Sequence, residues 1–587
     1  MSDQNSQRRL YYLLGAALLL VLVGGLLASY IQTAGGTVKI KDVRFMGTNG
    51  TEMSALLYIP NGVTAEKPAP GIVAIHGYIN SRETQDGFAI EFARRGYVVL
   101  ALDQTGHGYS DPPAFANGFG GPDGLKYLRS LDIVDKDNVA LEGHSMGGWA
   151  SLAAAITYQE DYKSIVIEGS STGAPFAAEG TTTWPRNLAV VFSQWDEFSD
   201  LMWGVPTGKD IVNSEKLKTV FGTTDPVEPG KLYGSIDDGT ARQLYAPRGT
   251  HPNDHISTEA IGYAIDWIQR TISGGNGLPV SDQIWYWKEI GTFIQFIGFV
   301  LALFPVGALL LQGSWFNELS EPLPEAKPAK GTLWWVGAAL SIILPALTFF
   351  WLQNQAATLV PASAFFPQTI TSGIMVWGVG NGIITLVLFL IWHFQANRKN
   401  GATGDTYGVN WAGGLSWRKI GKSLLLAVCI TGVGYLLLVI SDFVFKTDFR
   451  LWVLALKPMN FLQFHITLAY LIPFAFFFLV SSVAINGQMR QEVTLRRAML
   501  VNAALLAGGI FIMLLIQYIP LMGGSPLPLG ESLLTIVGIQ FVPLLIIVAF
   551  IQTYFFRKTG HIYTGAFVCA IFITWYIVAG QAIQFAF

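Results

Sequence analysis

Long uncharged apolar runs constrain this chain more than any other feature of its sequence. The first run covers residues 10–31 and follows Arg8 and Arg9. About 20 apolar residues in a helix cross the hydrocarbon core of a bilayer, and this run is longer than the apolar part of a usual signal peptide. We therefore expect an uncleaved anchor helix within residues 1–36. Eight further runs predict spans near residues 289–312, 332–353, 370–394, 422–441, 461–485, 499–520, 532–555 and 562–585.

Basic residues in the connections between these runs predict how the chain is oriented. Fourteen Lys and Arg residues flank the N-terminal run and alternate short loops, whereas the opposite connections after residue 284 carry four. Basic connections favour the cytoplasmic side of a membrane. We therefore expect a multi-pass protein of the cell membrane, with a cytoplasmic N-terminus and with residues 37–284 and the C-terminus outside.

The membrane part, residues 285–587, shows signs of an internal repeat. Three short matches recur in the same order: residues 293–296 with 461–464, residues 398–401 with 557–560, and the surroundings of Cys429 with those of Cys569. Such matches predict two four-helix units in parallel orientation, residues 285–445 and 455–587.

Residues 37–284 have an ordinary globular composition. The short β-rich runs GIVAIHG, GYVVLALD, NVALEG, SIVIEG and NLAVVFS alternate with stretches that are able to form helices. This alternation predicts an α/β fold, a mostly parallel sheet with helices on both faces. The segment carries 19 basic and 30 acidic residues, which argues against a nucleic-acid partner. No metal-ligand spacing and no phosphate-binding glycine loop is present, so we predict neither a metal nor a cofactor.

The run NVALEG ends in Gly143-His144-Ser145-Met146-Gly147, a G-x-S-x-G pattern that leads into a helix of small residues. On such a sharp strand-to-helix turn, the serine hydroxyl stands free above the sheet. The backbone N–H groups of Met146 and of Tyr78, which follows the strand GIVAI, are then placed to bind a developing oxyanion.

Three motifs in a fixed order resemble the α/β-hydrolase superfamily, in the style of its dienelactone-hydrolase, esterase and cutinase-like branches. They are His76-Gly77, the run DQTGHGYSD at residues 103–111, and Gly143 to Gly148. The resemblance covers about residues 37–275 and does not extend to the membrane part. It implies a serine nucleophile, an acid at the end of a later strand and a histidine after the last strand.

The resemblance assigns candidate partners to Ser145. Asp196 matches the acid position, while Glu197 faces the other way if the strand continues. Two histidines, His251 and His255, are candidates for the base, and we favour His251 because its distance to the following helix resembles that of the family. His76, His107 and His144 are expected to hold turns by hydrogen bonds.

Two further segments carry expectations about the surroundings of Ser145. The chain between Asp196 and His251 is longer than one strand and one helix require, which predicts a flap over Ser145. Residues 443–458 alternate apolar and charged positions and are expected to lie flat on the outer leaflet, beneath or beside the globular domain.

Together these features predict a membrane-integrated serine hydrolase. Its substrate would be an ester, thioester or amide of an amphiphilic or lipid-like molecule, attacked at the extracytoplasmic membrane face, and its partners the lipid bilayer and this acyl substrate. Two alternatives stay open: an acyltransferase to an acceptor near the membrane, and a transporter or lipid-handling module with a hydrolase-like appendage. The sequence predicts no oligomeric state.

Overall fold

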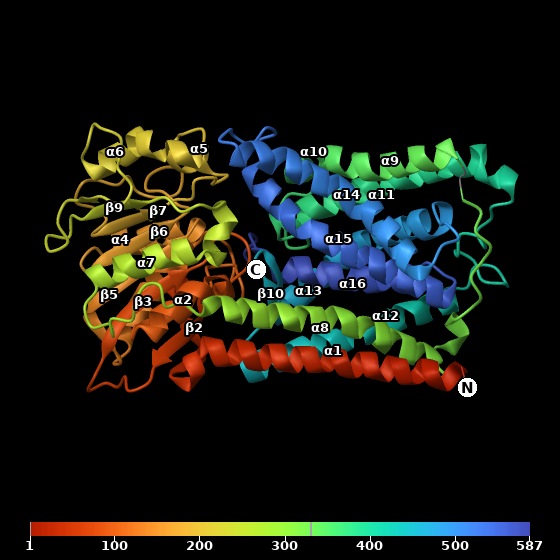
Figure 1. Cartoon of the computed structure of the whole chain (residues 1–587), viewed down its shortest axis with the longest axis horizontal. Helices are drawn as coiled ribbons and strands as arrows, with labels where there is room; N and C mark the ends of the chain where they lie inside the picture. The colour runs from red at the N-terminus through yellow and green to blue at the C-terminus, as the bar shows by residue number, and fades with distance from the viewer. Residues whose placement is uncertain (1, 329–330) are drawn as a thin grey trace.

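The computed structural model describes residues 2–328 and 331–587, which form a globular part and a bundle of long helices placed end to end (Figure 1). A nine-stranded sheet forms the centre of the globular part. Its strands are β1 (Val38–Met46), β2 (Glu52–Pro60), β3 (Ala69–Ile75), β4 (Val98–Leu102), β5 (Val134–His144), β6 (Ser164–Glu168), β7 (Leu188–Val191), β8 (Leu232–Tyr233) and β9 (Arg242–Tyr245).

The strands are arranged in the order β1-β2-β4-β3-β5-β6-β7-β9-β8. Pairing is parallel from β4 through β3, β5, β6 and β7 to β9, while β2 pairs antiparallel with β1 and β4, and β8 with β9. The five strands predicted from apolar runs are β3 to β7, so the prediction of a mostly parallel sheet is confirmed.

Helices cover both faces of this sheet. Successive strand residues point to opposite faces, so each apolar strand contributes side chains to two cores. Val73 and Ile75 of β3 belong to the apolar core under α3 (Gly121–Ser130) and α4 (Met146–Thr157). Their neighbours Ile72 and Ala74 belong to the core under α2 (Asp86–Arg94) and α7 (Thr258–Thr271). Two short helices, α5 (Ser199–Trp203) and α6 (Glu215–Phe221), lie in the insertion between β7 and β8.

The second part is the bundle of long apolar helices. Its members are α1 (Ser2–Gln32), α8 (Trp285–Gln312), α9 (Thr332–Leu347), α10 (Phe349–Leu359), α11 (Thr369–Gln395), α12 (Trp417–Phe445), α13 (Phe461–Ser482), α14 (Leu495–Met522), α15 (Ser532–Thr559) and α16 (Tyr563–Ala579). Within the described residues, seven helices are long and apolar enough to cross a membrane, or eight if the pair α9 and α10, bent by 52°, counts as one span. Such a set fits a multi-pass membrane protein.

The last predicted span, residues 562–585, is shorter than expected. Helix α16 has 17 residues, about 26 Å at the usual helical rise, so the prediction of a full-length span is wrong here. The chain leaves the helix at Gly580 and its last residues bind the globular part. The Asn80 N–H donates to the Gly580 carbonyl at 2.9 Å, and the Ala114 N–H to that of Ile583 at 2.7 Å.

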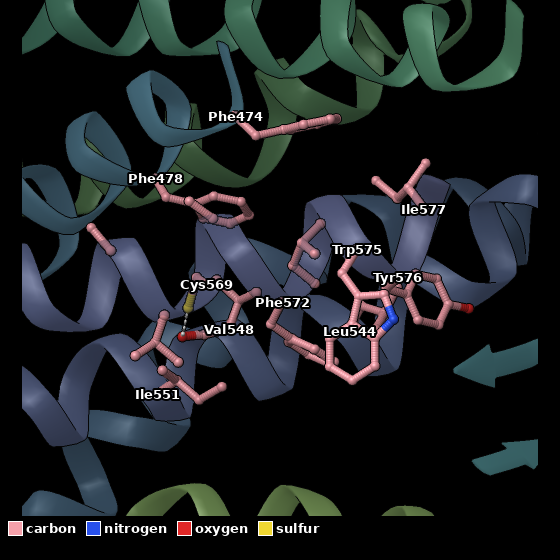
Figure 2. Close-up of a cluster of buried hydrophobic side chains, with 14 of the residues drawn as sticks. Phe474, Phe478, Leu544, Val548, Ile551, Cys569, Phe572, Trp575, Tyr576 and Ile577 are labelled. Carbon is pink, nitrogen blue, oxygen red and sulfur yellow. Dashed lines mark hydrogen bonds between the residues drawn. The ribbon is translucent and has the colours of Figure 1, made fainter. Parts of the chain in front are cut away.

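Helix α16 lies in the middle of the bundle. Figure 2 shows its side chains Cys569, Phe572 and Trp575 among Phe474 and Phe478 of α13 and apolar residues of α15. All residues of α16 are buried except a partly exposed Ile571. A helix that is apolar on every side is typical of a protein core or of a membrane span.

The two predicted four-helix units show matching helix pairs. The first helix packs on the fourth in each unit, α8 on α12 and α13 on α16, and the second packs on the third, α10 on α11 and α14 on α15. These are the pairings that the repeat requires; the repeat itself stays a prediction.

Buried ion pairs join the globular part to the bundle. Lys288 of α8 pairs with Asp86 of α2. The hairpin of β10 (Phe449–Leu451) and β11 (Leu454–Leu456) contributes Arg450, which lies 4.0 Å from Glu83 of the globular part. Lys457 lies 3.5 Å from the same carboxylate.

The hairpin corrects the expectation for residues 443–458. The segment runs beneath the globular domain, as predicted, but Phe449 and Leu456 are 0% exposed. Residues 447–457 are therefore largely buried between the two parts instead of lying on a membrane surface, whereas Phe443 and Val444 at the end of α12 are 77% and 56% exposed. The apolar residues of this buried stretch pack between the two parts, and its basic residues Arg450 and Lys457 pair with buried carboxylates. This explains the alternation in the sequence.

Candidate active site

Ser145 lies on a strained turn between β5 and α4. Its backbone has φ 57° and ψ −122°, a combination that costs an ordinary residue free energy. A Cβ atom at Gly147 would lie 1.9 Å from the Ile75 carbonyl oxygen, and one at Gly143 would lie 2.2 Å from the Gly147 carbonyl oxygen. The two glycines of the pattern are therefore required by the close approach of strand and helix.

Asp196 and His251 meet beside this turn. Asp196 follows β7, and His251 begins the short 3₁₀ helix His251–Ile256 after β9. His251 Nδ1 lies 2.8 Å from Asp196 Oδ2, and both side chains are buried. Asp196 also accepts the N–H of Phe198 at 2.7 Å, which fixes the carboxylate in place.

Burial governs the protonation of this pair. It lowers the pKa of His251 to about 4 and raises the pKa of Asp196, because a charged group is costly in an apolar surrounding. The imidazole is therefore neutral at physiological pH and able to accept a proton.

Two more imidazoles surround His251. The ring of His144 is 4.6 Å from that of His251 and 4.0 Å from that of His255. His144 Nε2 lies 2.9 Å from the His251 carbonyl oxygen. Neither His144 nor His255 contacts Asp196, so of the two base candidates it is His251 that the structure pairs with the predicted acid.

The two N–H groups expected to bind an oxyanion are free. Among the described residues, neither the N–H of Tyr78 nor that of Met146 donates to a protein acceptor. Met146 is the first residue of α4, and the N–H groups at a helix start have no partner within the helix and favour negative charge. Tyr78 follows His76-Gly77 at the end of β3.

Ser145, His251, Tyr78 and Met146 border one cavity of about 300 Å³. In the described part of the chain, the Ser145 hydroxyl makes no hydrogen bond with His251; such bonds are often looser without substrate. The remaining walls of the cavity are mostly apolar: Ile79, Phe115, Phe119, Trp149, Phe176, Phe198, Leu201 and Met202 from the globular part, and Trp452, Val453, Leu533 and Ile536 from the bundle.

The insertion between Asp196 and His251 covers the cavity only in part. Leu201 and Met202 of α5 line it, whereas α6 and β8 contribute no lining residue. The expected flap over Ser145 is therefore limited to α5 and to Phe198, which precedes it.

Three loops of the candidate site, those of Tyr78, Glu197 and His251, are also bound to the bundle. The Tyr78 hydroxyl lies 2.9 Å from Gln584 Nε2, and Trp452 Nε1 donates to the Pro252 carbonyl at 2.8 Å. Glu197 accepts the His251 N–H at 2.7 Å and the Tyr518 hydroxyl at 2.7 Å. Since Glu197 is buried and lies beside Asp196, its pKa is raised to about 8.

The sequence prediction missed these contributions from the bundle. It treated Glu197 as facing away from Asp196 and gave it no role, and it assigned Trp452 to a membrane surface. Asp254 was also overlooked, although it is buried beside the imidazoles and accepts the Ser193 hydroxyl at 2.5 Å. The only sequence feature that could have pointed to a role for Trp452 is its place among charged residues in a connection between two spans.

The other three histidines of the globular part, His76, His107 and His144, bind backbone groups, in line with the expectation. Besides His144, described above, His76 Nε2 accepts the Gln104 N–H at 3.2 Å. His107 Nδ1 lies 2.9 Å from the Thr105 carbonyl oxygen and its Nε2 lies 2.8 Å from that of Tyr78. These contacts hold the loops after β3 and β4.

Residues 70–200 match a protein-family model described as alpha/beta hydrolase fold. The chain is 29% identical over 91 residues to a proline iminopeptidase of Saccharolobus solfataricus, which covers 15% of this chain and 29% of that protein. It is 35% identical over 80 residues to a 2-hydroxy-6-oxononadienedioate/2-hydroxy-6-oxononatrienedioate hydrolase of Cupriavidus pinatubonensis, 14% of this chain and 28% of that protein.

The matches cover a small part of the relatives. An uncharacterized protein of Mycobacterium tuberculosis is 32% identical over 99 residues, and the chain spans only 26% of its length. Among solved structures, an esterase of Pyrococcus furiosus aligns with 40% of this chain and 92% of its own, at 16% identity and a TM-score of 0.30.

Proposed function

We propose that the globular part of this chain, whose residues 70–200 match an alpha/beta hydrolase fold, hydrolyses an ester, thioester or amide through an acyl-enzyme on Ser145. One observation carries the proposal: His251, hydrogen-bonded to the buried Asp196, borders the same cavity as Ser145, whose helix begins with a free N–H. Nucleophile, base, orienting acid and oxyanion donors are the groups that acyl transfer by serine requires.

The roles follow from these positions. His251 Nε2 takes the proton of the Ser145 hydroxyl as the oxygen attacks the carbonyl carbon, and Asp196 orients the ring through Nδ1. The N–H groups of Tyr78 and Met146 donate to the oxyanion of the tetrahedral intermediate. The C–X bond then breaks, and the leaving alcohol, thiol or amine takes its proton from His251. Water repeats the sequence on the acyl-enzyme and releases the acid.

The proposed location is the extracytoplasmic face of a membrane. The bundle has seven helices that could span one, and the basic connections favour the cytoplasm at the far end from the globular part. The C-terminus lies next to the globular part (Figure 1), so both are on the same side of the bundle.

Covalent labelling tests the function. A fluorophosphonate should modify Ser145 of the full-length protein in detergent, and Ser145→Ala should abolish labelling and lower hydrolysis by about 10³-fold or more. Ser130→Ala, at the end of α3 and outside the lining of the cavity, serves as a matched control and should label normally. An unlabelled wild-type protein with an intact fold would reject the proposal.

A further inference from the structure

The bundle of apolar helices forms one wall of the catalytic cavity. Trp452 and Val453 at the tip of the β10–β11 hairpin and Leu533, Ile536 and Gln540 of α15 line the same cavity as Ser145. Ile536 is 6% exposed. No span residue was needed for the chemistry above, yet without these five side chains the cavity would be open on this side.

The position of these wall residues along α15 sets the depth of the cavity relative to the membrane. Helix α15 begins at Ser532, so Leu533 lies in its first turn and Ile536 in its second. The ends of membrane spans lie in the interfacial region, between the hydrocarbon core and water. The carboxyl esters of lipids lie in the same region, with their acyl chains directed into the core.

The cavity is suited to an apolar chain. Its polar lining groups are few, and the histidines among them surround Ser145. Three large apolar side chains that line it are also widely exposed: Phe115 at 45%, Phe176 at 54% and Leu201 at 45%. Exposed apolar residues around a mouth mark a binding surface for an apolar partner.

The hairpin holds its part of the wall in a fixed position. Trp452 has a positive φ of 55°, and its ring N–H donates to Pro252 next to His251. Arg450 is anchored by Asp448 at 2.5 Å. A wall that is rigid before substrate arrives binds with less loss of conformational entropy.

We propose that this cavity is an acyl-chain site built jointly by the two parts, and that the protein takes a membrane-resident acyl ester or thioester from the leaflet next to the globular domain. The chain lies against Val453, Leu533 and Ile536, and the scissile carbonyl reaches Ser145 at the level of the lipid headgroups. This inference rests on the proposed hydrolase function and adds its substrate class.

Labelling rates test the site without knowledge of the natural substrate. The full-length protein is reconstituted in phosphatidylcholine vesicles, and Ser145 is labelled with methyl-chain and with hexadecyl-chain fluorophosphonates. We expect the long-chain probe to react at least about tenfold faster than the short-chain probe, because it buries more apolar area against the wall.

Two variants of the wall are compared with matched controls. Ile536→Trp fills the cavity, and Leu533→Gln makes the wall polar; each should slow the long-chain probe at least about tenfold more than the short-chain probe. Ile519→Trp and Leu529→Gln alter side chains at the same end of the bundle that are 65% and 52% exposed and line no part of the cavity. These controls should keep the wild-type ratio of the two rates.

The outcomes separate the two proposals. No labelling of the wild type by either probe rejects the hydrolase function and this inference with it. Labelling without preference for the long chain, or a preference that both wall variants retain, leaves the hydrolase function standing and overturns the acyl-chain site. Equal slowing of both probes in both wall variants also overturns it, since that pattern indicates general damage to the cavity.

Discussion

The two walls of the catalytic cavity differ in chemistry. The wall from the globular domain carries the groups of the proposed reaction: Ser145, the two N–H groups and His251, which is hydrogen-bonded to Asp196. The wall from the bundle carries Trp452, Val453, Leu533 and Ile536, which are apolar apart from the indole N–H, together with Gln540. In the proposed function, the globular part therefore supplies the reacting groups, and the bundle shapes the rest of the cavity.

The bundle also fixes the loops on which the reacting groups lie. Gln584 binds the Tyr78 side chain, Trp452 binds the loop of His251, and Tyr518 binds Glu197 next to Asp196. A catalytic group displaced by about 1 Å can lower a rate by about 10²-fold. The junction is thus expected to influence turnover although it takes no part in the reaction.

The largest expected effect is a loss of activity that distinguishes His251 from His255 as the base. His251→Ala should lower kcat/KM by about 10³-fold or more, because Ser145 loses its proton acceptor. His255→Ala should lower it less than about tenfold, since His255 does not contact Asp196. Hydrolysis of an ester by the purified variants measures both, and a larger loss in His255→Ala would assign the base to His255.

The next effect concerns the ion pair between Lys288 and Asp86, which joins the globular part to the bundle. Lys288→Met leaves Asp86 as a buried carboxylate without its cation and should destabilise the protein by about 3–5 kcal/mol. Lys288→Met combined with Asp86→Asn should recover a part of this loss. Thermal unfolding of the full-length protein in detergent measures the difference, and equal stability of Lys288→Met and wild type would contradict a structural role of the pair.

A smaller effect is expected at the contact between Glu197 and the bundle. Tyr518→Phe and Glu197→Gln each remove or weaken one of the hydrogen bonds that link α14 to the His251 backbone. We expect kcat to fall about tenfold in each with little change in KM, since the substrate does not contact these groups. The double variant should lose no more than the more affected single variant, and additive losses would show that the two residues act separately.

The smallest effect appears in the pH profile. A solvent-exposed histidine has a pKa near 6.5, and activity that requires its neutral form falls below that pH. Burial lowers the pKa of His251 to about 4, so the base stays neutral on acidification. We expect kcat/KM at pH 5.5 to remain above about half its value at pH 7, whereas a fall to about a tenth would show an unperturbed base.

Local patterns explain why the catalytic wall was predictable. The turn at Ser145 is specified by Gly143 and Gly147, which no other residue could replace, and the strands before Ser145 and Asp196 are short apolar runs. Asp196 and His251 followed from chain order in a fold that the sequence resembles. The structure brings these two side chains to 2.8 Å from each other, as that chain order predicts.

The membrane wall was not predictable for the opposite reason. Trp452 and Ile536 lie more than 300 residues after Ser145 in the chain, and nothing in an apolar span says which of its faces meets lipid and which meets another domain. The break between α9 and α10 and the early end of α16 were also missed, because hydropathy records how apolar a segment is and not where its helix bends or stops.

The sequence by itself determined the elements: the apolar spans, the parallel sheet and the strained turn of Ser145, since each depends on residues close together in the chain. Tertiary structure decided which side chains meet: it placed the hairpin and α15 against the cavity, tied Glu197 to Tyr518 and buried His251. These contacts depend on the packing of distant segments, and burial, which shifts the pKa of a base and shapes a pocket, exists only once that packing is complete.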